Sequence, residues 1–434
     1  MPQANPNEIA VRCYTEKPPK PKKENQRPRP LDEPSEFTLV FDCETTTDEA
    51  QTLRFGFYQI RQGVELYEQG VFYCPKTLTA PELITLKAFA DDGGFRVITV
   101  GEFQKDIFLK VAYHWGGLVV GFNIPFDVSR IAIGHAPARR QLRGGFSFKF
   151  ATDRRVPALR IRHLDRKSAM FGFAAPKTQT TGRSRRKKQD ITPHHRGYFC
   201  DLKTLAAALT SRSFSLASLA DYLGVQTQKQ ETSEHGQTLT PSYLSYACDD
   251  VQATWECHLE LSDRYAAHGL TSPAHRVLSE ASVGKSHIKD MGIKPLLECQ
   301  PDYDKNLLGK ILCGYYGGRT EVHIRRVITE VIYCDFKSMY PTVNSLMGLW
   351  SFVIADGMTV HTTTEETQAL LNRIQYQDFQ KQEQWQVLTT LVRLKPNDDL
   401  LPVRAKYDGK VRTIGLNHLT AETLTCPLRV VQLL

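Results

Sequence analysis

The sequence lacks the paired cysteines of a zinc-binding or disulfide-stabilised protein. Its ten cysteines stand singly along 434 residues, and no C-x-x-C pair occurs. A chain of this size needs no disulfide framework to build a core. We therefore expect reduced thiols and a cytoplasmic protein without a structural zinc site.

Long apolar runs are also missing. No stretch approaches the roughly 18 consecutive apolar residues of a membrane-spanning helix, and the N-terminal residues contain no apolar core of a secretion signal. We also find no internal repeat. The sequence predicts neither membrane insertion nor secretion.

The charge balance is modestly basic, with a formal net charge of +8 and a pI of about 8.9. This makes a polyanionic partner compatible with the chain but does not identify one. Residues 1–36 are polar and rich in Pro and Lys, and such a segment cannot bury enough apolar surface to order itself. We expect a disordered tail that adds only non-specific attraction to phosphate.

Ordered structure is predicted from Phe37 onward. Short apolar, β-branched runs at residues 37–42, 53–60 and 64–74 predict three antiparallel strands joined by tight turns. Next we expect a helix around Lys105–Trp115 and strands at 116–123 and 197–201, each of which leads into a helix. An amphipathic helix that ends at Gly224 follows. A long helix is expected at Pro241–Arg264, capped by Thr240. This order predicts an α/β domain.

One segment breaks the pattern. Residues between Ala174 and Arg196 are basic and without periodicity, which indicates an exposed loop. A solvated charge run and a DNA-facing loop are equally compatible with this composition.

Two carboxylates follow the first strand as a D-x-E pair, Asp42 and Glu44. Because side chains two apart on a strand point to the same face, these acids lie side by side. Adjacent carboxylates repel one another unless a cation lies between them, and Mg²⁺ prefers such oxygen ligands.

Two further acidic motifs can face this pair. In N-I-P-F-D, Asp127 follows a strand and opens a helix together with Asn123 and Phe126. In Y-A-C-D-D, Tyr246 and Asp250 are four apart and share a helix face, whereas Asp249 points elsewhere. We therefore expect Asp250, and not its neighbour, to join the site.

These motifs together resemble those of the DEDD superfamily of 3′–5′ exonucleases that carry a tyrosine in the third motif. The family patterns are D-x-E, N-x-x-F/Y-D and Y-x-x-x-D, and this sequence has FDCETT, NIPFD and YACDD in that order. The resemblance covers residues 37–265 and implies a ribonuclease H-like fold with a mixed sheet.

The resemblance also implies a site. Asp42, Glu44, Asp127 and Asp250 would hold two Mg²⁺ or Mn²⁺ ions, which stabilise the attacking and departing oxygens in phosphodiester hydrolysis. Tyr246 would orient the attacking water by a hydrogen bond. Its ordinary pKa near 10 makes it a weak base at neutral pH, so the metal would have to favour deprotonation of the water. Asn123 and Phe126 would contact the terminal nucleotides of single-stranded 3′ ends or primer-template DNA.

The later sequence resembles family B DNA polymerases. Residues 266–330 would be a connector with a Tyr-Gly-Gly segment, in which Tyr316, Gly317, Gly318 and Arg319 would contact DNA. Residues 331–434 would be part of an α+β palm. The segment VIYCDFKSMYPTVN predicts a strand that ends in Asp335 and then a turn into a helix. It resembles the first palm motif, D-x-x-S-L-Y-P, with Met339 in place of Leu. It implies that Asp335 binds catalytic metal, and that Phe336, Ser338, Met339 and Tyr340 lie at the incoming nucleotide.

Two parts of a polymerase do not follow: the second palm aspartate and the fingers lysine motif. One aspartate does not assemble a two-metal polymerase site. Three hypotheses remain: an active exonuclease with an incomplete palm, one subunit of a split polymerase, or a non-catalytic remnant that binds DNA. We expect a bacterial, phage or mobile-element protein, cytoplasmic and associated with the nucleoid through DNA.

Overall fold

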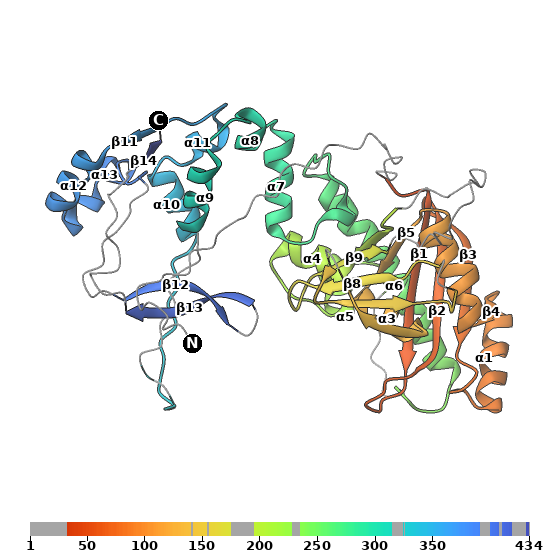
Figure 1. The fold of residues 1–434 in the computed structure, drawn as a ribbon. Helices are drawn as coiled ribbons and strands as arrows, with labels where there is room; N and C mark the ends of the chain where they lie inside the picture. The colour runs from red at the N-terminus through yellow and green to blue at the C-terminus, as the bar shows by residue number, and fades with distance from the viewer. Residues whose placement is uncertain are drawn as a thin grey trace, which may run out of the picture. The chain divides into compact units, whose positions relative to one another are not determined.

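The chain divides into two compact units. A computed structural model describes residues 33–139, 142–153, 156–174, 195–227, 235–314, 324, 326–390, 400–407, 410–418 and 431–433. The first unit holds the described residues up to Met291, and the second those from Gly292 onward (Figure 1). Most of the predicted tail 1–36 and of the basic loop 174–196 lies outside the described residues.

A six-stranded mixed sheet organises the first unit. Its strands in chain order are β1 (Phe37–Thr45), β2 (Leu53–Gln62), β3 (Glu65–Tyr73), β4 (Arg96–Thr99), β5 (Leu118–Gly121) and β10 (Tyr198–Asp201). The spatial order is β10-β5-β1-β2-β3-β4. Strands β1, β2 and β3 pair antiparallel, as predicted, while β5 and β10 add parallel to β1. The α/β class is confirmed, and β1 lies inside the sheet.

Helices cover one face of this sheet. They are α1 (Ala80–Gly93), α4 (Leu202–Thr210), α5 (Leu216–Leu223) and α6 (Pro241–Ala266). A buried core joins them to the inward side chains of the strands, among them Val40, Phe55 and Val120. Two sequence expectations are confirmed here, since Thr240 accepts a hydrogen bond from the Tyr243 N–H and Gly224 ends α5 in the left-handed conformation.

The opposite face carries a second core. A helical stretch runs through α2 (Val100–Glu102), η1 (Phe103–Phe108) and η2 (Lys110–His114), with π-type turns in its second and third parts, and α3 (Ile124–Ile131) follows β5. Alternate β1 residues Leu39, Phe41 and Cys43 pack on this side. Strand β1 therefore separates the two cores.

A second sheet also covers this face. Its four antiparallel strands are β6 (Gly134–Pro137), β7 (Phe146–Lys149), β8 (Leu159–His163) and β9 (Ala169–Phe173). The side chains of Leu159, Ile161 and Phe173 belong to the second core. The sequence interpretation missed this sheet, and it also missed α1 and β4.

The resemblance to exonucleases ends at residue 265, but the first unit continues beyond this residue. The segment continues through η4 (Ala274–Arg276) and α7 (Glu280–Asp290), and α7 packs against α4. The expected connector 266–330 therefore contributes structure to the first unit.

The second unit consists of short elements. They are α8 (Leu296–Cys299), α9 (Lys305–Gly314), α10 (Met339–Leu346), α11 (Trp350–Ile354), β11 (Val360–Thr362), α12 (Thr364–Arg373), η5 (Tyr376–Gln380), α13 (Gln382–Gln386), β12 (Leu400–Tyr407), β13 (Lys410–His418) and β14 (Val431–Leu433). Strands β12 and β13 form an antiparallel hairpin, and β11 pairs with β14.

One expectation about this unit is wrong. The residues 331–336 form no strand leading to Asp335, although the predicted helix follows as α10. A strand needs a neighbour to satisfy its backbone groups, and no pairing involves these described residues.

None of the helices in the described ranges has the length and apolarity needed to cross a membrane.

Candidate metal centre

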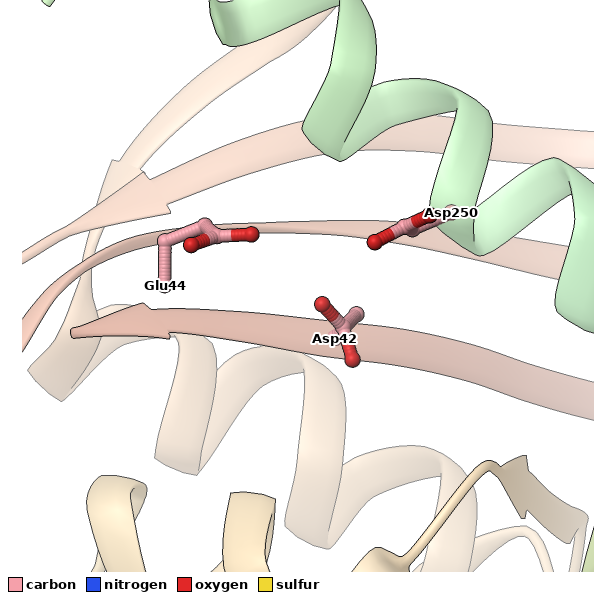
Figure 2. Close-up of side chains that lie close together, drawn as sticks. All are labelled: Asp42, Glu44 and Asp250. Carbon is pink, nitrogen blue, oxygen red and sulfur yellow. The ribbon is translucent and has the colours of Figure 1, made fainter. Parts of the chain in front are cut away.

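Three of the predicted carboxylates come together in the first unit. Asp42 and Glu44 project from β1 and Asp250 from α6, and one oxygen of each lies within 4.8 Å of the others. Figure 2 shows the carboxylates turned toward a shared space between strand and helix. The three residues come from two motifs some 200 residues apart in the sequence.

The sheet and the cap of α6 explain this convergence. On β1, Val40 belongs to the core beneath α6, so Asp42 and Glu44 point the same way by the two-residue period. The Thr240 cap fixes where α6 starts, and Tyr243, Tyr246 and Asp250 then recur on its buried face. The cluster contains Asp250 and not Asp249.

The donor set fits a hard divalent cation. All three groups are carboxylates, and Asp250 is only 2% exposed, so water screens the repulsion between them weakly. Oxygen ligands within 4.8 Å of one another suit Mg²⁺ or Mn²⁺. The arrangement can therefore hold a metal ion, whose identity this geometry does not select.

Asp127 lies beside this cluster but is not a member of it. Its Oδ1 accepts a hydrogen bond of 3.2 Å from the backbone N–H of Cys43, the residue between Asp42 and Glu44. Burial, and next the neighbouring Asp42 carboxylate, raise the pKa of Asp127 well above its ordinary value. The fourth predicted carboxylate thus reaches β1 from the α3 side and interacts electrostatically with the cluster.

A buried carboxylate that the sequence interpretation missed supports α3. Asp201 ends β10, caps α4 and accepts a 2.8 Å hydrogen bond from the Asn123 N–H. Burial raises the pKa of Asp201 to about 6. Asn123 itself has a left-handed backbone with φ of 71°. Asp201 therefore positions the strained turn that leads into Asp127.

A second missed residue is Tyr243, one turn before Tyr246 on α6. Its hydroxyl donates a 2.6 Å hydrogen bond to Oε2 of Glu44, and its ring packs edge-on against Phe55. Burial, and next the Glu44 charge, raise the pKa of Tyr243 far above its ordinary value, so the hydroxyl keeps its proton. The sequence did contain a signal for Tyr243, because a residue three positions before Tyr246 lies on the same face of the helix.

His235 also borders the cluster. Its Nδ1 lies 3.6 Å from Oε2 of Glu44, and its ring meets the rings of Tyr243 and Tyr246 at near right angles. Tyr246 is buried on the same side of α6. Two tyrosines and a histidine therefore surround the Glu44 end of the site.

Asn123 and Phe126 lie on the α3 side of the site. Phe126 is partly buried, and the guanidinium of Arg130 stacks on its ring at 4.8 Å from the centroid. Both residues line one pocket. The structure thus brings the two predicted DNA contacts together with Asp127 on a single helix.

The predicted palm residues do not form a comparable centre. Asp335, Phe336, Ser338, Met339 and Tyr340 are all exposed in the second unit. Ser338 precedes α10 with a left-handed backbone, φ 56°. The predicted DNA contacts Tyr316, Gly317, Gly318 and Arg319 lie outside the described residues.

No protein-family model matches this chain, and no curated protein matches it either. A functional conclusion therefore rests on the geometry of the site and on the sequence motifs.

Proposed function

We propose that the first unit is a metal-dependent 3′–5′ exonuclease acting on DNA. The observation that carries the proposal is the convergence of Asp42, Glu44 and Asp250, from separate motifs, to within 4.8 Å. The motifs that contain them, together with N-I-P-F-D, resemble those of DEDD exonucleases in kind and order. A cytoplasmic, DNA-associated location and a ribonuclease H-like fold belong to the same proposal.

The residues have distinct tasks in this proposal. Asp42, Glu44 and Asp250, with Asp127 beside Asp42, would hold two Mg²⁺ or Mn²⁺ ions. When bound, these ions stabilise the charge on the entering and departing oxygens of the phosphodiester. Tyr243 fixes the orientation of the Glu44 carboxylate, and Tyr246 orients the attacking water. Asn123 and Phe126 hold the terminal nucleotides against α3.

A second candidate concerns the second unit. Apolar side chains stand largely exposed along residues 327–336: Val327, Ile328, Val331, Ile332, Tyr333 and Phe336. Soluble proteins rarely leave such a contiguous apolar stretch in water, so this exposure fits both a unit that another chain covers and a non-catalytic remnant. We propose that this unit is an incomplete polymerase palm that another chain completes. A primer-extension assay tests this, since extension would appear only with the second chain, and extension by the chain alone would contradict it.

The exonuclease proposal is tested with a 5′-labelled single-stranded DNA. Degradation from the 3′ end is expected with Mg²⁺ and not with EDTA. Asp42→Asn and Asp250→Asn should each lower the rate by more than about 100-fold, because even the outer partners of metal ligands cost 10–100-fold. Asp249→Asn is the matched control, since this neighbouring acid lies outside the cluster. Cleavage that persists in both site variants would overturn the proposal.

A further inference from the structure

A pocket lies in the first unit at the outer edge of β10. Its volume is about 370 Å³, within the range of small-molecule sites. None of the carboxylates of the candidate metal centre lines it. The lining residues come from β9, residues 195–201, α4 and residues 274–278: Ala169, Met170, Phe171, His195, Arg196, Gly197, Tyr198, Phe199, Cys200, Asp201, Thr204, Leu205, Ala274, His275, Arg276, Val277 and Leu278.

The pocket follows the edge of the six-stranded sheet. Strand β10 ends the sheet, and no strand in the described ranges pairs with it on the side away from β5. The seven successive residues 195–201 all line the pocket, and η4 packs against the strand. Each residue of β10 is at most 6% exposed. An added peptide strand needs an open edge, so this short, covered edge suits a small molecule better.

Aromatic rings form one wall of the pocket. The ring of His195 is nearly parallel to those of Tyr113 and Tyr198, at centroid distances of 5.1 and 5.7 Å. Its Nε2 lies 2.6 Å from the carbonyl oxygen of Tyr113, and its Nδ1 accepts a 3.0 Å hydrogen bond from the Gly197 N–H. Tyr198 also meets the ring of His275 edge-on at 5.3 Å. Rings held in this way offer a fixed surface to another flat ring.

Two arginines give the pocket a positive charge. Arg196 and Arg276 both line it and are exposed. Burial, and next the Arg276 charge, lower the pKa of His275 to about 4, so this ring is neutral at neutral pH. Asp201 is the one acid among the lining residues, and its buried carboxylate accepts the Asn123 N–H. A guanidinium prefers phosphate or carboxylate oxygens, so the expected ligand is an anion.

We propose that this pocket binds a small phosphate monoester that carries a flat ring. A phosphate monoester has a charge of about −1.5 to −2 at pH 7, which balances the two guanidinium groups. The ring lies against Tyr198 and His275, and the phosphate contacts Arg196 and Arg276. The proposal goes beyond the exonuclease function and does not depend on it, because no metal ligand takes part.

The test is isothermal titration calorimetry of the full chain without metal or DNA. The probe is 1-naphthyl phosphate, and it is compared with inorganic phosphate and 1-naphthol, which each carry only one of its two groups. We expect 1-naphthyl phosphate to bind at least about tenfold more tightly than either, because the pocket holds both linked groups at once. Equal affinity for 1-naphthyl phosphate and for either single-group probe would overturn the proposal.

Variants of the two arginines locate the binding. Arg276→Gln and Arg196→Gln should each weaken 1-naphthyl phosphate binding about tenfold, because each loses a charge-assisted contact. Binding of 1-naphthol should stay unchanged in both, which also shows that the pocket is still folded. Loss of 1-naphthol binding in both variants would contradict the assigned role of the two charges.

The matched control is Arg212→Gln. Arg212 is an exposed arginine that lies over the ring of Tyr222 at 5.6 Å and does not line the pocket. This variant should bind 1-naphthyl phosphate like the wild type. An equal loss in Arg212→Gln, or wild-type affinity in both pocket variants, would refute the site.

Discussion

At the scale of single residues, the orientation of Glu44 depends on Tyr243. The hydrogen bond from the Tyr243 hydroxyl to Glu44 joins residues 199 apart in the sequence, and no sequence motif predicts it. Another tyrosine makes the same type of bond away from the site, since Tyr58 donates to Glu68 at 2.7 Å and is equally buried. Removing each bond in turn therefore separates a loss of stability, expected in both cases, from a loss of metal affinity, expected only for the bond to Glu44.

We predict that Tyr243→Phe lowers both stability and metal affinity. Loss of a hydrogen bond to a charged acceptor costs about 1.5–3 kcal/mol, and loss of an outer partner of a metal ligand costs about 10–100-fold in affinity. Urea unfolding and a Mn²⁺ titration measure the two effects. Tyr58→Phe should lower stability alone. Identical metal affinity in both variants would contradict the positioning role.

His258 provides a pH prediction at the same scale. This residue of α6 is buried, and burial lowers its pKa from about 6.5 to about 4. Between these values the unfolded chain binds more protons than the folded one, so the imidazole costs stability as the pH falls from 6.5 toward 4. The loss reaches about 3 kcal/mol at pH 4.

Replacing this histidine should remove that part of the acid sensitivity. In His258→Gln, the fall in unfolding free energy between pH 7 and pH 4 should be smaller than in the wild type by about 3 kcal/mol. Urea denaturation at the two pH values measures it. Parallel pH profiles for the two proteins would show that His258 is not protonated preferentially on unfolding.

At the scale of elements, a buried ion pair fixes the segment before α6. Arg54 of β2 donates to Glu82 of α1 at 2.6 Å and to the carbonyl of Gln237 at 2.6 Å, and Glu82 also accepts from the Leu239 N–H. Both charged side chains are nearly inaccessible to water. Strand, helix and the chain leading to Thr240 are therefore held together at one point.

We predict that Glu82→Gln destabilises the first unit by about 3–5 kcal/mol, because it leaves the guanidinium buried without its counter-charge. Thermal or urea unfolding measures this. The exposed pair Arg264–Glu260, at 2.9 Å on α6, is the control, and Glu260→Gln should cost no more than about 0.5 kcal/mol. A similar, small loss in both variants would refute the anchoring role of Glu82.

Length and periodicity explain only part of which elements were predicted, since the four-residue β5 and β10 were predicted and the 14-residue α1 was missed. The ten-residue β2 and the 26-residue α6 carry long apolar patterns and recognisable caps, and both were predicted. Strands β7, β8 and β9 have only four or five residues each, which is too short for a clear two-residue pattern, so their signal is weak. Asp201 and Tyr243 act through contacts that only the tertiary structure creates.

At the scale of the whole molecule, both apolar cores belong to the first unit. Their buried members all lie between Leu39 and Val277. The candidate metal centre and the pocket lined by Asn123 and Phe126 lie there as well. The account therefore does not require the second unit for metal binding or hydrolysis.

We predict that a fragment of residues 33–291 folds cooperatively and retains the Mg²⁺-dependent cleavage of the full chain within about threefold. The physical reason is that a domain with its own core folds alone. Calorimetric unfolding and the single-strand cleavage assay measure the two properties. A fragment that unfolds without a cooperative transition would contradict the division into two units.

The central claim is that Asp42, Glu44 and Asp250 form a divalent metal site. The most direct measurement is a Mn²⁺ titration of the full chain followed by electron paramagnetic resonance, with wild type, Asp42→Asn and Asp249→Asn compared. The account predicts tight binding in the wild type and in Asp249→Asn, and binding at least about 100-fold weaker in Asp42→Asn. Equal Mn²⁺ affinity in all three proteins would contradict it.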